Sequence, residues 1–250
     1  MASQAPDLRS EVRRLAEQQN RLFAQLEAGQ QHFRHLARSV WRVQEDERRR
    51  LARELHDGIG QHLTAMRHRL LQLGDEVEGD AVSRLNQALE LCETALAETR
   101  ALSRLLRPQI LDDLGLEAAL NWLARHSSAE GGFQVEVDVR GLPEPLDRDL
   151  ATLIFRVAQE ALANAQKHAQ ASHVVIRLTG RARRLTLLIV DDGRGCDVEQ
   201  ALARAGQGES TGLASVAERV RLFDGELSLE STPGEGLQLR VKLPLPEVSP

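Results

Sequence analysis

The sequence predicts an α+β protein in which an N-terminal coiled coil and a dimeric four-helix-bundle hairpin precede an α/β sandwich. Three observations predict this fold class. Apolar residues repeat in heptads near the N-terminus, two amphipathic helices separated by a polar turn follow, and helical and strand-like patterns mix after Pro108. We therefore divide the chain into a coiled-coil helix at 1–45, a dimerisation hairpin at 46–110, an α/β domain at 111–246 and a tail at 247–250.

The first element is a helix whose apolar stripe keeps an alternating 4-3 spacing, with Gln19 and Gly29 filling its two gaps. This spacing is typical of a coiled coil, because the stripe of a solitary surface helix drifts at 3.6 residues per turn. The register fails at Glu47 and Arg50 and a new stripe begins at Leu51, which predicts a phase change inside one long helix. The first stripe consists of Leu8, Val12, Leu15, Leu22, Leu26, Phe33, Leu36, Val40 and Val43.

A polar turn at 74–80 ends this helix, and a second amphipathic helix then runs from Val82 to Leu106. Two helices joined by a short turn form an antiparallel hairpin, which cannot bury both of its apolar faces alone. We therefore expect two chains to pair into a four-helix bundle, so that the protein is a homodimer.

The remainder reads as an α/β sandwich because its apolar residues follow both helical and alternating patterns. Residues 133–139 (FQVEVDV), for example, alternate like a half-buried strand. The expected helices cover 113–127, 147–169 and 213–223, and the expected strands cover 133–139, 174–178, 185–190, 226–230 and 237–243.

Composition excludes several classes of protein. The 32 Lys+Arg against 37 Asp+Glu give a net charge of −5 with basic residues scattered throughout, which argues against a nucleic-acid binder. Two distant cysteines, Cys92 and Cys196, make neither a disulfide scaffold nor a thiolate zinc site. Without an apolar run of about 18–20 residues or a signal peptide, we expect a cytoplasmic chain with no membrane span.

The segment ELHDGIGQHL contains the first candidate site. His56 lies next to a core position, so we expect its side chain to project from the bundle. The alternative to a reactive histidine is an ordinary solvent-exposed one, which is more common at such a position. Asp57 could accept the proton of an imidazole that reacts at its other nitrogen, and Gln61, one turn later, could orient a water molecule. A metal site at His56 and Asp57 is disfavoured because His62 and His68 do not complete a ligand set.

The helix FRVAQEALANAQKHA contains the second candidate site. Glu160, Asn164, Lys167 and His168 lie three or four residues apart, opposite an apolar face. The alternative is an ordinary polar helix surface. The chain has only two lysines, however, and an ammonium at Lys167 suits a phosphate oxygen, while the oxygen of Asn164 suits a hard, partly hydrated magnesium ion.

Glycine-containing turns follow. In VDDGRGCD a carboxylate ends an apolar strand and could accept from an exocyclic amine, although such a turn is common by itself. Gly206, Gly208 and Gly212 form a glycine-spaced loop, and Ser210 or Thr211 could cap a helix that starts near Leu213, with free N–H groups for phosphate oxygens. STPGEG makes a last turn, and no P-loop motif exists.

The order of these motifs resembles that of two-component sensor histidine kinases. ERRRLARELHDGIGQHL is similar to the dimerisation helix of the subfamily that includes nitrate sensors and DegS-like kinases, and LRPQILDDLGLEAAL is similar to its link into the catalytic domain. The resemblance covers roughly 45–245. It implies that the hairpin is a histidine phosphotransfer domain and that the C-terminal domain has the Bergerat ATP-binding fold of gyrase, Hsp90 and MutL.

The resemblance also implies roles for individual residues. His56 would accept the phosphoryl group, Asp57 would be the neighbouring base, and Gln61 would position water for dephosphorylation. The expected metal ligands are Asn164 and Glu160, the latter with a less definite role. The expected ATP-binding residues are Asp191 at the adenine amine, Gly193 and Gly195 along the nucleotide, Lys167 and His168 near the phosphates, and Gly208, Thr211, Gly212 and Leu213 in and after a lid at 196–212.

Two departures from the family pattern bear on turnover. Glu209, Ser210 and Thr211 separate Gly208 from Gly212, and Leu237 stands where a threonine often follows the last GxG. Both would alter lid closure or phosphate contact and so slow nucleotide turnover.

The resemblance implies a dimeric cytoplasmic kinase that uses ATP and Mg²⁺, phosphorylates His56 and passes the phosphoryl group to the receiver domain of a response regulator, which it also dephosphorylates. Input would reach the coiled coil from an upstream sensor protein, or the chain would be the cytoplasmic part of a larger receptor. Two alternatives are a Bergerat ATPase without a phosphoacceptor and a non-catalytic coiled-coil scaffold.

Overall fold

The computed structural model describes residues 8–74, 77–106, 110–181, 183–198 and 211–245. Two compact units are distinguished, residues 1–43 and 44–250, and each is described by itself. None of the helices in these described ranges has an apolar stretch long enough to cross a bilayer.

The first unit is helical. Its described residues, from Leu8 onward, belong to α1 (Leu8–Arg53), as the heptad pattern predicts. The apolar stripe lies in solvent in the single chain: the exposed fraction is 61% for Leu15, 69% for Phe33 and 70% for Val43. Pairing of this stripe with a second chain stays a prediction.

The backbone of the second unit starts with the end of α1 and changes form around the candidate histidine. The helix passes directly into a π-helix, η1 (Glu54–Gly60), and then into α2 (Gln61–Leu73). The sequence pattern predicts a change of phase near Glu47–Leu51, but it does not predict π geometry, which is rare and is frequent at functional sites.

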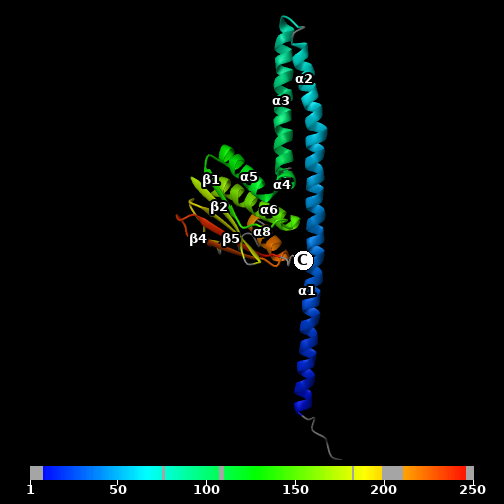
Figure 1. Cartoon of the computed structure of the whole chain (residues 1–250), viewed down its shortest axis with the longest axis vertical. Coiled ribbons are helices and arrows are strands. Elements are labelled where there is room, and N and C mark those ends of the chain that lie inside the picture. The colour runs from blue at the N-terminus through cyan, green and yellow to red at the C-terminus, as the bar shows by residue number, and fades with distance from the viewer. Residues whose placement is uncertain (1–7, 75–76, 107–109, 182, 199–210, 246–250) are drawn as a thin grey trace, which may run out of the picture. The chain divides into compact units, whose positions relative to one another are not determined.

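The helix α3 (Asp80–Leu106) packs side by side with α2 as the predicted hairpin (Figure 1). The thiol of Cys92 donates to the carbonyl of Leu63 at 3.3 Å, and Arg67 pairs with Glu93 at 2.8 Å. Large apolar side chains remain exposed on the second unit's helices, as expected of half a bundle: Leu51, Ile59, Met66, Leu71, Leu73, Val82, Leu91 and Leu102.

A five-stranded mixed sheet forms the α/β domain, with strand order β1-β2-β3-β5-β4. β1 and β2 are parallel and the other neighbours are antiparallel. The strands are β1 (Gln134–Arg140), β2 (His173–Arg181), β3 (Arg184–Asp191), β4 (Glu226–Ser231) and β5 (Leu237–Pro244). The helices are α4 (Ile110–Asp113), α5 (Gly115–Gly131), α6 (Arg148–Asn164), a π-helical turn η2 (Ala165–Ala169) and α8 (Thr211–Leu222).

The core lies between the sheet and the helices α5, α6 and α8 (Figure 1). Alternate residues of the central strands are buried, such as Ile176 and Leu187, because successive strand side chains point to opposite faces. The side chain of Asp147 caps α6 by accepting from the backbone N–H groups of Asp149 and Leu150. The α+β fold class is therefore confirmed, with one difference: the helix expected over 147–169 changes to π geometry at Ala165.

Candidate functional site

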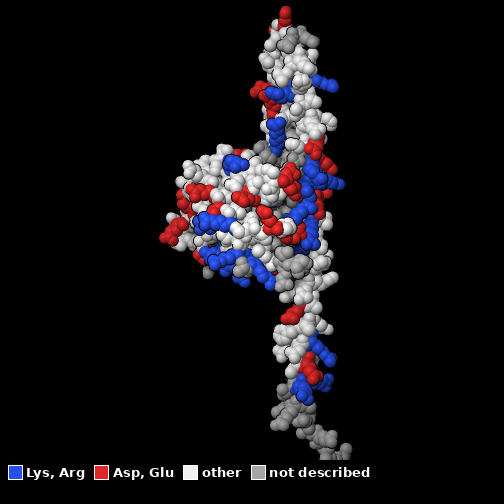
Figure 2. Space-filling model, viewed as in Figure 1, with Lys and Arg blue, Asp and Glu red and all other residues white. Residues whose placement is uncertain are grey.

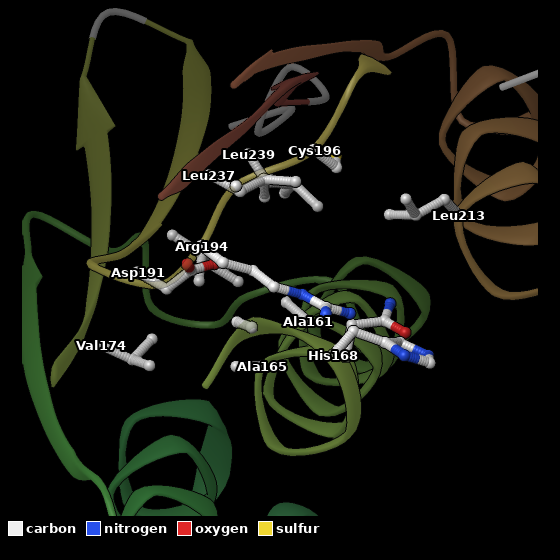
Figure 3. Close-up of a pocket in the computed structure, with 14 residues that line it drawn as sticks. Ala161, Ala165, His168, Val174, Asp191, Arg194, Cys196, Leu213, Leu237 and Leu239 are labelled. Atoms are coloured by element: carbon white, nitrogen blue, oxygen red, sulfur yellow. The ribbon is translucent and has the colours of Figure 1, made fainter. Parts of the chain in front are cut away.

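A cavity of about 210 Å³ opens in the α/β domain between the end of α6, the start of β2, the end of β3, the start of β5 and the start of α8 (Figure 3). Most of its wall is apolar, and its polar side chains come from four residues, Asn164, His168, Asp191 and Arg194. The other lining residues are Ala161, Ala165, Ala169, Val174, Ile189, Gly195, Cys196, Leu213, Leu237 and Leu239.

Asp191 ends β3 and its side chain lies at the apolar end of the cavity (Figure 3). The residue is 9% exposed, and its carboxylate accepts from the backbone N–H of Gly193 at 3.0 Å. Burial raises the pKa of Asp191, against the lowering effect of the backbone N–H groups of Gly193 and Leu237. A carboxylate that has lost this much hydration is a strong acceptor for an N–H group of a ligand.

The opposite end of the cavity is polar. Asn164 ends α6, and its Nδ2 donates to Oε1 of Glu160 at 3.3 Å, which leaves Oδ1 as the atom of this amide that suits a cation. His168 comes from η2 and is exposed at the same end (Figure 3). Lys167, its neighbour, is also exposed but does not line the cavity, and neither does Glu160.

Arg194 is a cavity residue that the sequence pattern does not single out. It is the second of the two variable residues of the D-x-G-x-G motif, and its long side chain reaches across the cavity toward His168 (Figure 3). The motif's regularity draws attention to its aspartate and glycines, whereas only the fold shows where the variable side chain points. The geometry adds a guanidinium to the polar end.

The glycines of the turns, Gly193, Gly195 and Gly236, lie where backbone segments approach each other closely. A Cβ at Gly193 would lie 2.5 Å from the carbonyl oxygen of Ala169, so this glycine is needed for the approach of two chain segments. Gly195 and Gly236 have positive φ values of 62° and 78°. A Cβ at Gly195 would overlap the carbonyl of Thr232, and only Gly195 of these three lines the cavity.

The start of α8 approaches α6 closely. A Cβ at Gly212 would overlap the carboxylate of Glu160, which lies against the first turn of α8. Leu213 lines the cavity, as expected. Gly208 lies outside the described residues, as does most of the expected lid, and the side chain of Thr211 is not described either.

The other candidate site, around His56, lies on the hairpin. His56 and Asp57 belong to η1, Gln61 begins α2, and all three side chains are exposed. The exposure of His56 agrees with the expectation that it projects from the bundle. Within the described ranges no three His, Cys, Asp or Glu side chains gather as a metal-binding group, so a cation at Asn164 and Glu160 would need further oxygen ligands from a bound molecule.

Comparison with known proteins gives the same two parts. Residues 47–111 match the family model HisKA_3, "Histidine kinase", and residues 149–247 match the model HATPase_c, "Histidine kinase-, DNA gyrase B-, and HSP90-like ATPase". A histidine kinase domain from the blue-light activated histidine kinase of Erythrobacter litoralis EL346 aligns with a TM-score of 0.46 and 21% identity, over 74% of this chain and 94% of that one.

Curated relatives align over most of the chain. The sensor histidine kinase MctS of Rhizobium johnstonii is 36% identical over 84% of this chain and 45% of its own length. ComP of Bacillus subtilis, also a sensor histidine kinase, is 33% identical over 84% of this chain and 28% of its own length. The signal transduction histidine-protein kinase/phosphatase DegS of Brevibacillus brevis is 32% identical over 82% of this chain and 53% of its own length. The chain thus spans between about a quarter and about a half of these relatives. Because a histidine kinase model and a histidine kinase-like ATPase model both match this chain, and these sensor histidine kinases align with most of it, the chain belongs to the sensor histidine kinases.

Proposed function

We propose that this chain transfers the terminal phosphoryl group of ATP to His56 and then to an aspartate of a response regulator. The observation that carries the proposal is the presence, in one chain, of an exposed histidine on a hairpin and a cavity with an apolar, acidic end and a cationic end. A nucleotide has the same polarity, with a flat base at one end and phosphates at the other.

In this proposal the base of ATP occupies the apolar end, where the carboxylate of Asp191 accepts from the adenine amine. The phosphates extend toward His168 and Arg194, with Lys167 close by on the same π-helical turn. Backbone N–H groups in the first turn of α8, near Gly212, add favourable donors for phosphate oxygens. Gly208 and Thr211 are proposed to contribute from the lid.

Mg²⁺ fits the oxygen atoms at the polar end. The Oδ1 atom of Asn164 would hold the ion and Glu160, whose carboxylate accepts from Nδ2 of the same amide, would orient it or bind the ion through water. When bound, the ion neutralises charge on the phosphates. Two protein oxygens suffice because magnesium usually takes its other ligands from phosphates and water.

The residues of the hairpin perform the transfer. A ring nitrogen of neutral His56 forms a bond to the γ-phosphorus while the bond to the β–γ bridging oxygen breaks, and ADP leaves with that electron pair. Asp57 accepts or orients the proton on the other ring nitrogen. Gln61 positions a water molecule when the phosphorylated regulator is hydrolysed. The exposure of all three side chains supports this access.

We also propose the assembly in which this happens. The exposed apolar stripe of α1 and the uncovered faces of the hairpin support a homodimer with a four-helix bundle. Boundaries at 1–45, 46–110, 111–246 and 247–250 remain our division of the chain. ATP and a receiver domain are cytoplasmic partners, so we place this region in the cytoplasm, with input from an upstream protein or receptor segment. On the face of the α/β domain shown in Figure 2, acidic and basic side chains both occur, a mixture that does not favour nucleic acid as a partner.

The test is labelling by γ-labelled ATP in the presence of Mg²⁺. The wild-type chain should gain an acid-labile, base-stable label, the behaviour of phosphohistidine, and His56→Gln should lose it while ATP binding is unchanged. His62→Gln is the matched control, because His62 is another exposed histidine, six residues later at the start of α2. Normal labelling of His56→Gln would refute the assignment, and ATP hydrolysis without any protein label would favour the ATPase alternative.

A further inference from the structure

Among the residues that the structure describes, the most completely buried charged side chains outside the nucleotide cavity are those of Arg156 and Glu45, which form an ion pair and are each only 5% exposed. Nε of Arg156 lies 3.2 and 3.1 Å from the two carboxylate oxygens, and Nη2 lies 2.8 Å from Oε2. The guanidinium also donates to Gln159 at 2.7 Å and to the carbonyl of Leu106. The pair is therefore bidentate, and Nη1 and Nη2 of the guanidinium also donate to other partners.

This ion pair joins three parts of the second unit that are far apart in sequence. Glu45 lies on α1, Leu106 ends α3, and Arg156 lies in the middle of α6, 111 residues after Glu45. Two further contacts tie the same region together. Arg49 pairs with Asp112 at 2.9 Å, and the hydroxyl of Ser103 donates to the carbonyl of Ala52 at 3.0 Å in a buried setting.

The ion pair connects Glu45 to α6, the helix that carries the proposed metal ligands. Arg156, Glu160 and Asn164 follow one another at intervals of four, so they lie along one side of α6. The nucleotide cavity therefore cannot move relative to the hairpin unless α6, which Glu45 contacts through Arg156, moves with it.

The ion pair lies far from the proposed phosphoacceptor along the helix. Glu45 precedes His56 by eleven residues of continuous helix, which corresponds to about 16 Å along the helix axis at 1.5 Å per residue. A domain held at Glu45 is thus anchored about three helical turns away from the imidazole that must receive the phosphoryl group.

We propose that the Glu45–Arg156 ion pair is a latch that holds the ATP-binding domain in a position unable to phosphorylate His56, and that its opening permits autophosphorylation. The inference rests on the proposed kinase reaction and adds a control step to it. Rotation of α1 by a single residue step, about 100°, would turn the carboxylate away from the guanidinium, so input along this helix would act directly on the latch.

A buried ion pair has the energetics that a reversible latch needs. Taking both charges out of water costs about as much as their attraction returns, so opening, which rehydrates both groups, is cheap. Removing one partner is different, because the other charge is left buried and unpaired whenever the domain stays closed. Single neutral substitutions should therefore favour the open state.

The first experiment measures the initial rate of autophosphorylation of Glu45→Gln and Arg156→Gln. Each should raise the rate about tenfold, which corresponds to a shift of about 1.4 kcal/mol between closed and open states. The double variant should be no faster than the faster single variant, because both changes break one pair. Glu93→Gln, which breaks the exposed Arg67–Glu93 pair of the hairpin, should leave the rate unchanged.

A gain of activity separates a latch from a merely structural contact, because a folding defect lowers the rate. Glu45→Gln also lies outside the α/β domain, so it remains informative if Arg156→Gln folds poorly. Unchanged or lower rates in a folded Glu45→Gln chain with normal ATP binding would overturn the proposal.

The second experiment does not depend on kinase activity. Carboxyl modification by carbodiimide and glycine ethyl ester, read by mass spectrometry, should label Glu45 weakly in the wild-type chain and several-fold more in Arg156→Gln. Glu47, whose side chain is 49% exposed, serves as the internal reference. Equal labelling of Glu45 in both proteins would refute the latch, whereas a wild-type chain that never labels from ATP would refute the kinase reaction and leave this result standing.

Discussion

The carboxylate of Asp191 gives the sharpest test of the nucleotide cavity, because its substitution should move stability and binding in opposite directions. Asp191→Asn replaces a buried ionised group by a neutral one of the same shape, which resembles the protonated acid. Burial holds the pKa of Asp191 above its ordinary value of 3.8, so at neutral pH the fold disfavours the charged form. The variant should unfold at a higher temperature than the wild-type chain in the absence of nucleotide.

ATP binding should weaken in the same variant. A hydrogen bond to a charged acceptor contributes about 1.5–3 kcal/mol, so its loss predicts a Kd for ATP roughly 10- to 150-fold higher. Isothermal titration calorimetry measures the Kd and differential scanning calorimetry the unfolding temperature. A variant with unchanged affinity would refute the placement of adenine at Asp191, and a less stable variant would refute the burial argument.

The pH dependence supplies a second signature. Because the pKa is raised in the folded state, the stability that protonation of Asp191 confers is present at low pH and is lost as the pH rises through the folded-state value. ATP affinity should change the other way and fall as the carboxylate is protonated. Neither change should occur in Asp191→Asn.

The neighbouring residue is a matched control with the opposite sign. Asp192 is exposed and accepts from the backbone N–H groups of Ser172 and His173, both at 2.8 Å, and these hydrogen bonds lower its pKa. Its stabilising effect is present above the unfolded value of 3.8 and is lost as the pH falls through the lower folded-state value. Asp192→Asn should therefore lower stability slightly at neutral pH and leave the Kd for ATP unchanged.

Two further predictions concern residues near the same cavity. Gly193→Ala should destabilise the α/β domain by about 1–3 kcal/mol in urea unfolding, because the added Cβ meets the backbone of Ala169 at 2.5 Å rather than a movable side chain. Gly58→Ala, with nothing within 4 Å of the added atom, should leave that transition unchanged, and equal losses in both would contradict the packing argument. Arg194→Gln should raise the Kd for ATP roughly tenfold, the value of one charge-assisted hydrogen bond, and that for adenosine hardly at all. A similar loss for both ligands would show that Arg194 contacts the base end instead.

Much of the fold can be predicted from local patterns. Apolar spacing predicts the long helix, the hairpin and every strand, because a helix or strand shows its buried face within a few residues of sequence. The order of the histidine, asparagine and glycine motifs predicts both candidate sites. The cavity accordingly contains Asn164, His168, Asp191, Gly195 and Leu213.

Backbone geometry at two places departs from those patterns. The π-helical segments Glu54–Gly60 and Ala165–Ala169 keep the residues helical, so the apolar spacing that predicts a helix is satisfied while the hydrogen-bond pattern differs. Both segments carry candidate site residues, His56 in the first and His168 in the second. Because a π-helix has more residues per turn than an α-helix, these side chains point in different directions from those of an ideal α-helix. The spacing of apolar residues does not predict this difference.

The sequence by itself thus determined the elements, their order and the two sets of motifs, since these depend on contacts between residues close in the chain. The tertiary structure alone decided that Gly193 makes room for Ala169, that Arg194 reaches toward His168, and that Glu45 pairs with Arg156. Each of these depends on segments brought together across tens of residues or more. The spacing of residues along one helix does not show which distant residue will lie beside a given charged side chain. Such pairs can therefore be identified only from the folded structure.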